Sequence, residues 1–191
     1  MEDFLRGALQ SLRSPDEDTR LDGITAINEL VNGCFGDDGR MFGEMMRAQG
    51  GVLLLSNCLT DSSPDVQAQG LLVLGNICSD SVDSESMRTK KALLAIGGDR
   101  PLLTCLDSRE QDVLTLAVAT LQNLCNGGCP WAGRLPFFAL HAPAACISRA
   151  IASTDPPMSD PRRSRMVSRV DPEGGRAASG GDPEARSQMG G

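Results

Sequence analysis

The chain has 191 residues, 40% of them hydrophobic and none of them tyrosine, and its net charge is −7. This length suffices for one domain with a sizeable core or for a short array of repeats. The acidic balance argues against nucleic acid as a partner, because phosphate binding needs a basic face. No apolar run approaches the roughly 18 residues that a membrane-spanning helix needs, so no membrane partner is expected.

The seven cysteines and the first ten residues indicate the cellular compartment in which the protein is expected. An odd number of cysteines, behind a start (MEDFLRGALQ) that lacks the pattern of a secretory signal, is typical of free thiols in a reducing environment. The sequence therefore predicts a cytoplasmic location, with a nuclear one also compatible.

Helix starts and helical spacing mark the first and second predicted long helices. Ser14–Glu17 supplies an N-cap, a proline and early acids, and GITAINELVN (23–32) follows. Ser63–Asp65 has the same chemistry and precedes LLVLGNICSD (71–80). The apolar residues of this second run recur at helical spacing, at Leu71, Leu74, Ile77 and Cys78.

Two glycine pairs mark corners between shorter helices. Gly50-Gly51 and Gly97-Gly98 can each end a helix and allow a sharp turn. Each unit is therefore expected to hold a short helix, a corner, a second short helix, a polar turn and a longer third helix.

The long helix recurs at an offset of 47 residues. VATLQNLCNG (118–127) matches 71–80, and Asn123 lies 47 positions after Asn76. Stacked units bury an apolar face that one unit cannot bury alone, so the match predicts a repeat array. We expect repeats over residues 1–128, in units of about 1–33, 38–80 and 85–127. Other matched sets at this offset are Leu12, Leu59 and Leu106; Asp18, Asp65 and Asp112; Ile27, Leu74 and Leu121; and Leu30, Ile77 and Leu124.

Segments 50–80 and 97–127 resemble armadillo repeats. The shared features are the glycine corner, a leucine-rich second helix, a polar turn, and a third helix that ends in Leu74–Ile77 or Leu121–Leu124. A third copy, at 4–32, lacks the glycine pair and has glutamate in place of the asparagine. The resemblance covers residues 4–127 and implies an all-α fold, a right-handed α-α superhelix of about three repeats.

The C-terminal third has a different character. Residues 129–152 break the 47-residue pattern and are predicted to form a degenerate helical cap over the third unit. Residues 153–191 are rich in Pro, Gly, Ser and Arg and are predicted to be disordered, because they have too little apolar surface to offset the entropy of ordering.

The sequence offers little for catalysis or metal binding. His141 is the only histidine, so no triad or Cys-His pair is evident. Cys125 and Cys129 lack a second pair at ligand spacing. Cys58 and Cys105 repeat at the 47-residue offset, and so does the apolar position shared by Val31, Cys78 and Cys125, so we expect these cysteines to be small core residues. The sequence predicts no enzyme activity, no cofactor and no metal.

The third helices carry the candidate site. The resemblance implies that they line a concave groove, where the asparagine binds the backbone of an extended peptide through its donor and acceptor. The alternative is that these asparagines cap neighbouring helix ends or pair with the next repeat. Helical spacing places eight candidate groove residues on this side: Asp22, Glu29, Gln69, Leu72, Asn76, Leu116, Ala119 and Asn123.

Two differences from the armadillo pattern limit the functions that we expect. Receptors for nuclear import signals carry tryptophan four residues before the asparagine, where this chain has Leu72 and Ala119, so such a receptor is not expected. Glu29 replaces the first asparagine and, with Asp22, favours a basic end of the peptide. The basic tail (Arg162, Arg163, Arg165, Arg169) is one candidate for self-docking, with solvated disorder as the alternative.

The sequence thus predicts a non-enzymatic protein-interaction module that binds a protein or peptide partner. Two alternatives remain open. One is a small-GTPase regulator of armadillo type, and the other is a structural fragment of a longer armadillo array with no activity of its own.

Overall fold

The computed structural model describes residues 1–126, and the predicted cap (129–152), the predicted disordered tail and its arginines lie outside the described residues. All regular secondary structure in residues 1–126 is helical, so the predicted all-α class is confirmed there. The helices are α1 (Glu2–Ser11), α2 (Glu17–Gly33), α3 (Asp37–Ala48), α4 (Gly51–Cys58), α5 (Pro64–Ile77), α6 (Ser86–Ala95), α7 (Asp99–Cys105) and α8 (Gln111–Cys125).

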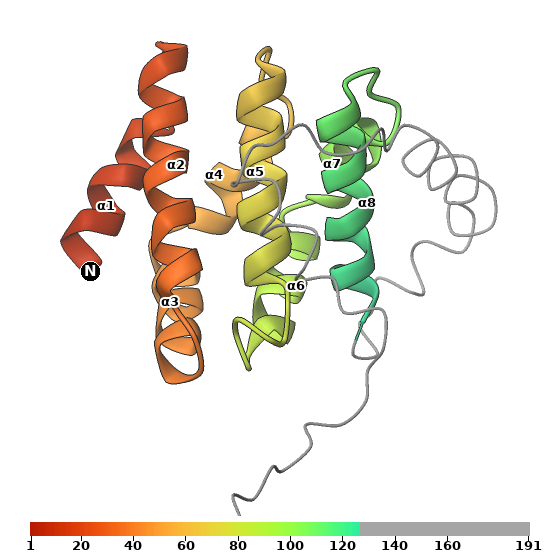
Figure 1. Ribbon diagram of the computed structural model, residues 1–191. Helices are drawn as coiled ribbons and strands as arrows, with labels where there is room; N and C mark the ends of the chain where they lie inside the picture. The colour runs from red at the N-terminus through yellow and green to blue at the C-terminus, as the bar shows by residue number, and fades with distance from the viewer. Residues whose placement is uncertain (127–191) are drawn as a thin grey trace, which may run out of the picture. The chain divides into compact units, whose positions relative to one another are not determined.

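The three longest helices form one layer. Helices α2, α5 and α8 run side by side in the same direction, α5 packing against both of the others (Figure 1). The shorter helices pack behind this layer, with α1 against α2, α4 against α5 and α7 against α8. Each long helix therefore buries one side against its neighbour and another side against a short helix, and keeps a third side for the surface.

The starts of α2 and α5 are capped by side chains at equivalent positions, whereas Glu110, the N-cap of α8, makes no such hydrogen bond. Ser63 is the N-cap of α5, as predicted, and its hydroxyl accepts from the backbone N–H of Val66. The prediction that Ser14 caps α2 is wrong, because Asp16 is the N-cap and accepts from the N–H and the hydroxyl of Thr19, at 2.8 and 2.6 Å. Asp16 lies 47 residues before Ser63. The repeat offset therefore locates the cap better than the local Ser-Pro pattern does.

Each glycine pair combines a left-handed residue with a close contact. Gly50 and Gly97 have φ of +73° and +74°, which other residues rarely adopt. A Cβ on the second glycine of each pair, Gly51 or Gly98, would collide with Met46 or Leu93. The corners therefore need both glycines.

The core runs through all the described helices, and its coverage differs along the array. Ile27 and Leu74 are fully buried, whereas their equivalent Leu121 on α8 is half-buried. Cys58 and Cys105 lie in the core, and burial raises the pKa of each thiol to about 11. Cys125, expected to be a core residue, is instead exposed, because it ends α8 and no further described helix packs over it.

An ion pair joins the start of α2 to the turn before α5. The Nη2 of Arg20 donates to Asp61 Oδ1 at 3.0 Å, and Nη1 donates to the carbonyls of Ser14 and Pro15. Burial raises the pKa of Asp61, but the hydrogen bonds from Arg20 and from the N–H of Ser63 outweigh this and leave the pKa below its usual value.

A second, more deeply buried ion pair joins α3 to the loop between α5 and α6. The Nη1 of Arg47 donates to Asp83 Oδ2 at 2.6 Å and to the hydroxyl of Thr89 at 2.7 Å. The carboxylate of Asp83 is fully buried. Gly43 leaves the space for it, since a Cβ there would collide with the carboxylate. This pair fixes the loop between α5 and α6 against α3.

Candidate functional site

The eight predicted groove residues all lie on the layer of long helices, at positions that retain solvent contact. We call these eight residues the third-helix surface. They comprise Asp22 and Glu29 on α2, which are exposed, and six half-buried residues, which are Gln69, Leu72 and Asn76 on α5 and Leu116, Ala119 and Asn123 on α8.

Asn123 already has a partner within the fold. Its Nδ2 donates to the backbone carbonyl of Gly75 at 3.1 Å. This carbonyl lies in the last turn of α5, where helix carbonyls lack their usual partner, and the N–H of Ser79 bonds the carbonyl of Asn76 instead. Asn123 therefore links α8 to the end of α5, which is the alternative role stated above. Within residues 1–126, its Oδ1 and second N–H form no other hydrogen bond.

Asn76 differs from Asn123. Its side chain is half-buried and forms no hydrogen bond within the described part of the chain. In the 47-residue series, the carbonyl that Asn123 bonds corresponds to that of Asn28 on α2. The Oδ1 of Asn28 is itself buried and has no hydrogen-bond partner in residues 1–126. The joint between α2 and α5 thus holds two amides with unused hydrogen-bonding capacity, which is costly unless a ligand or solvent satisfies it.

Sequence reasoning missed Thr120 and Asn28. The hydroxyl of Thr120 donates to the carbonyl of Leu71 at 2.9 Å, in the buried contact between α8 and α5. The equivalent residues in the other units are Val73 and Ala26, so a polar residue at a position that is otherwise apolar was the available signal. Asn28 gave no such signal, because its equivalents are Gly75 and Gln122, and only Gln122 carries an amide, so the position has no consistent chemistry.

The charge of the third-helix surface is confined to one end. Asp22 and Glu29 on α2 carry its two carboxylates, whereas its residues on α5 and α8 are amides or apolar. Leu72 and Leu116 expose part of their apolar side chains. The arrangement offers attraction for a cation at α2, amide hydrogen bonds at α5 and apolar contact towards α8.

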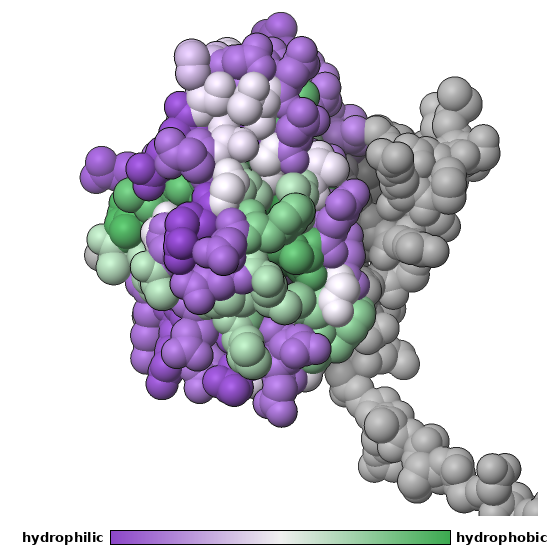
Figure 2. Space-filling view, turned by 90° about the vertical axis from the view of Figure 1, so that its left-hand side faces the viewer, coloured by the Kyte–Doolittle hydropathy of each residue, from purple (hydrophilic) through white to green (hydrophobic). Residues whose placement is uncertain are grey.

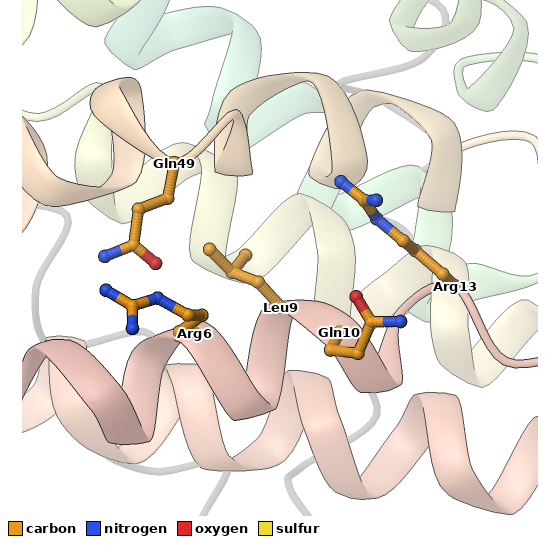
Figure 3. A pocket seen from close by; sticks show the side chains of 5 residues that line it. All are labelled: Arg6, Leu9, Gln10, Arg13 and Gln49. Carbon is orange, nitrogen blue, oxygen red and sulfur yellow. The ribbon is translucent and has the colours of Figure 1, made fainter.

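A separate hollow lies beside the short helix α1. It has a volume of about 250 Å³ and is lined by Arg6, Leu9, Gln10, Arg13 and Gln49. Figure 3 shows the Gln49 amide and the Arg6 guanidinium pointing toward one another across it. Arg6 is also paired with Glu2 and Asp3, at 3.0 and 3.1 Å. No nucleophile lines the hollow, and of its polar side chains Arg6, Gln10 and Arg13 are exposed whereas Gln49 is half-buried.

The described residues contain no candidate metal site and no candidate membrane-spanning helix. No group of three or more His, Cys, Asp and Glu side chains within residues 1–126 is arranged to hold a metal ion. Among the helices of the same range, none has the length and apolar content to cross a membrane.

Comparisons with known proteins show the fold and no more. No family model matches the chain, and no curated protein matches it. Among solved structures, the chain is similar to a designed armadillo repeat protein, with a TM-score of 0.52 and 22% identity. The match covers 62% of this chain and 46% of that protein, so the chain spans less than half of its length.

The fold is therefore an armadillo-like array of helical repeats. This confirms the resemblance inferred from the glycine corners and the third helices. In such a fold the layer of third helices is one face of the array, and that is the layer on which the eight predicted residues lie.

Proposed function

We propose that this chain is a non-enzymatic protein-interaction scaffold that binds an extended segment of a partner protein on the third-helix surface. The observation that carries the proposal is the half-buried Asn76, whose amide has no hydrogen bond within residues 1–126. An extended peptide presents unpaired N–H and C=O groups, and a side-chain amide can bond both kinds.

The amide oxygen of Asn28, unpaired within residues 1–126, also favours a peptide backbone that lies beside Asn76. This buried Oδ1 needs a donor, and an N–H of a bound segment can provide one beside Asn76. Asn123 contributes less, because one of its N–H groups already bonds Gly75. The proposed backbone contacts are therefore concentrated at the joint between α2 and α5.

The side chains around Asn76 define the preferred segment. Asp22 and Glu29 favour Lys or Arg over α2, with the modest strength and strong salt dependence of exposed ion pairs. Leu72 and Leu116 favour an aliphatic residue on the opposite side of Asn76. The partner is thus a short extended segment with a basic residue followed or preceded by an apolar one.

Selection from a library of displayed peptides, followed by calorimetry, tests this function. We expect enriched peptides to combine basic and apolar residues and Asn76→Ala to weaken their binding about tenfold or more, since two lost hydrogen bonds amount to about 1–3 kcal/mol. The matched control is Asn57→Ala, an exposed asparagine on α4. Peptides that bind both variants as tightly as the unmodified protein would contradict the proposal.

A further inference from the structure

The face of the array formed by α1 and α2 is partly apolar. Figure 2 shows hydrophobic side chains gathered across the middle of this face, between hydrophilic ones. Phe4 is 56% exposed, and Ala26 and Leu30 are half-buried. The equivalents of Ala26 in the other units are Val73 and Thr120, which are at most 1% exposed. A long helix covers those two positions, and none of the described helices covers Ala26.

A hollow on this face corresponds to a place inside the array that a side chain of the neighbouring long helix reaches. It lies between α1 and α2, with a volume of about 320 Å³, and Gly23 and Ala26 are among its lining residues. In the next unit Gly70 stands where Gly23 does, and a Cβ there would lie 3.7 Å from the Cδ1 of Ile24. The Ile24 side chain of one long helix thus reaches the small residue of the next. The nearest atoms to a Cβ at Gly23 all belong to Ala8, Ser11 and Leu12, beside α1, and none of the described long helices supplies a counterpart of Ile24 there.

The opposite face of the array, on α8, carries the residue equivalent to Ile24 in the third unit. Ile24 and Leu71 are fully buried, and the next member at the 47-residue offset is Val118 on α8, which is half-buried. Leu121 is likewise half-buried, although its equivalents Ile27 and Leu74 are fully buried. Within the array, each long helix packs against the next through two different surfaces. One end face of the described array, on α2, therefore carries the surface that faces a preceding long helix, and the other, on α8, carries the surface that faces a following one.

We propose that copies of this chain associate head to tail, with α8 of one copy packed against α1 and α2 of the next, at the end of the array where the sequence alone predicts a cap formed by residues 129–152. Val118 of one copy then enters the hollow beside Gly23, as Ile24 reaches Gly70 within the chain. Ala26 faces the backbone of α8, as Thr120 faces that of α5. The contact continues the packing of α2 on α5 and of α5 on α8.

The charges around the two faces allow this contact. Asp3 and Asp22 line the hollow. Thr115 and Gln122, which flank Val118 on the same side of α8, are uncharged, so no carboxylate is brought against another there. Because the two faces differ, the contact is heterologous and can add further copies.

Sedimentation of the full chain tests the proposal. We expect the average mass to rise with concentration above the 20.2 kDa of one chain. Ala26→Arg blocks one face and Val118→Arg the other, and each is expected to weaken association about tenfold or more, because an unpaired charge enters an apolar contact. Thr25→Arg, at an exposed position next to Ala26, is the matched control and is expected to associate normally.

A mixture of the Ala26→Arg and Val118→Arg variants provides the most specific test of head-to-tail association. Each retains one intact face, so we expect the mixture to form one-to-one dimers and nothing larger. A protein that stays monomeric at several hundred micromolar would overturn the proposal, and so would Ala26→Arg dimers formed without Val118→Arg. If circular dichroism shows that Ala26→Arg is unfolded, Phe4→Glu, at an exposed position on the same face, takes its place in the same mixture.

Discussion

Replacing Asp83 with alanine is expected to cost about 3–5 kcal/mol of unfolding free energy, the usual loss when one partner of a buried ion pair is removed. Arg47 is only 14% exposed and would keep its charge without the carboxylate 2.6 Å away. The backbone N–H of Glu85, which donates to Asp83 Oδ1 at 2.8 Å, would also lose its acceptor. Urea unfolding followed by circular dichroism measures the loss.

An exposed aspartate provides the matched control. Asp37 on α3 is paired with Arg40 at 3.8 Å and is 95% exposed, so Asp37→Ala is expected to change stability by less than about 1 kcal/mol. The double variant Arg47→Met/Asp83→Ala should recover part of the loss, because no charge remains buried. Equal stability of the Asp83 and Asp37 variants would show that the ion pair does not hold the loop before α6 to α3.

Leu74→Ala is expected to cost about 2–5 kcal/mol, whereas Leu121→Ala should cost clearly less, although the two residues are equivalent in the repeat. Leu74 is fully buried on α5, between α2 and α8, and its loss leaves a cavity that neither neighbour can easily fill. Leu121 is half-buried on α8. Thermal unfolding of dilute protein, where association between copies is negligible, provides the comparison.

Equal losses for the two leucine variants would contradict the repeat account. The difference between them depends only on how much of each side chain its neighbouring helices cover. Ile27→Ala, at the remaining equivalent position, is fully buried and should behave like Leu74→Ala.

The periodicity of the sequence predicted the helices well, because each long helix repeats its apolar positions at a constant offset. The local Ser-Pro pattern was right for Ser63 and wrong for Ser14. Ser14-Pro15 has the composition of a helix start, yet Asp16, the equivalent of Ser63, is the N-cap. Cys125 follows the core pattern of Val31 and Cys78 but is exposed, since burial depends on a following helix as well as on the residue's own position.

For the candidate residues, the sequence indicated their helices and exposure but not their hydrogen bonds. Helical spacing correctly indicated that Asn76 and Asn123 retain solvent contact. It could not show that Asn123 bonds the carbonyl of Gly75 while Asn76 has no partner in residues 1–126, because this depends on small differences in packing between the two joints. The pair of Arg47 and Asp83 was also hidden, since the two residues lie 36 positions apart and belong to no motif.

Nuclear magnetic resonance of the asparagine side-chain amides, during titration with a selected peptide, tests the central claim most directly. If the peptide lies on the third-helix surface, the amide signals of Asn76 and Asn28 should shift most, that of Asn123 less, and that of Asn57 on α4 not at all. A saturating peptide that shifts Asn57 and leaves Asn76 and Asn28 unchanged would contradict the proposal.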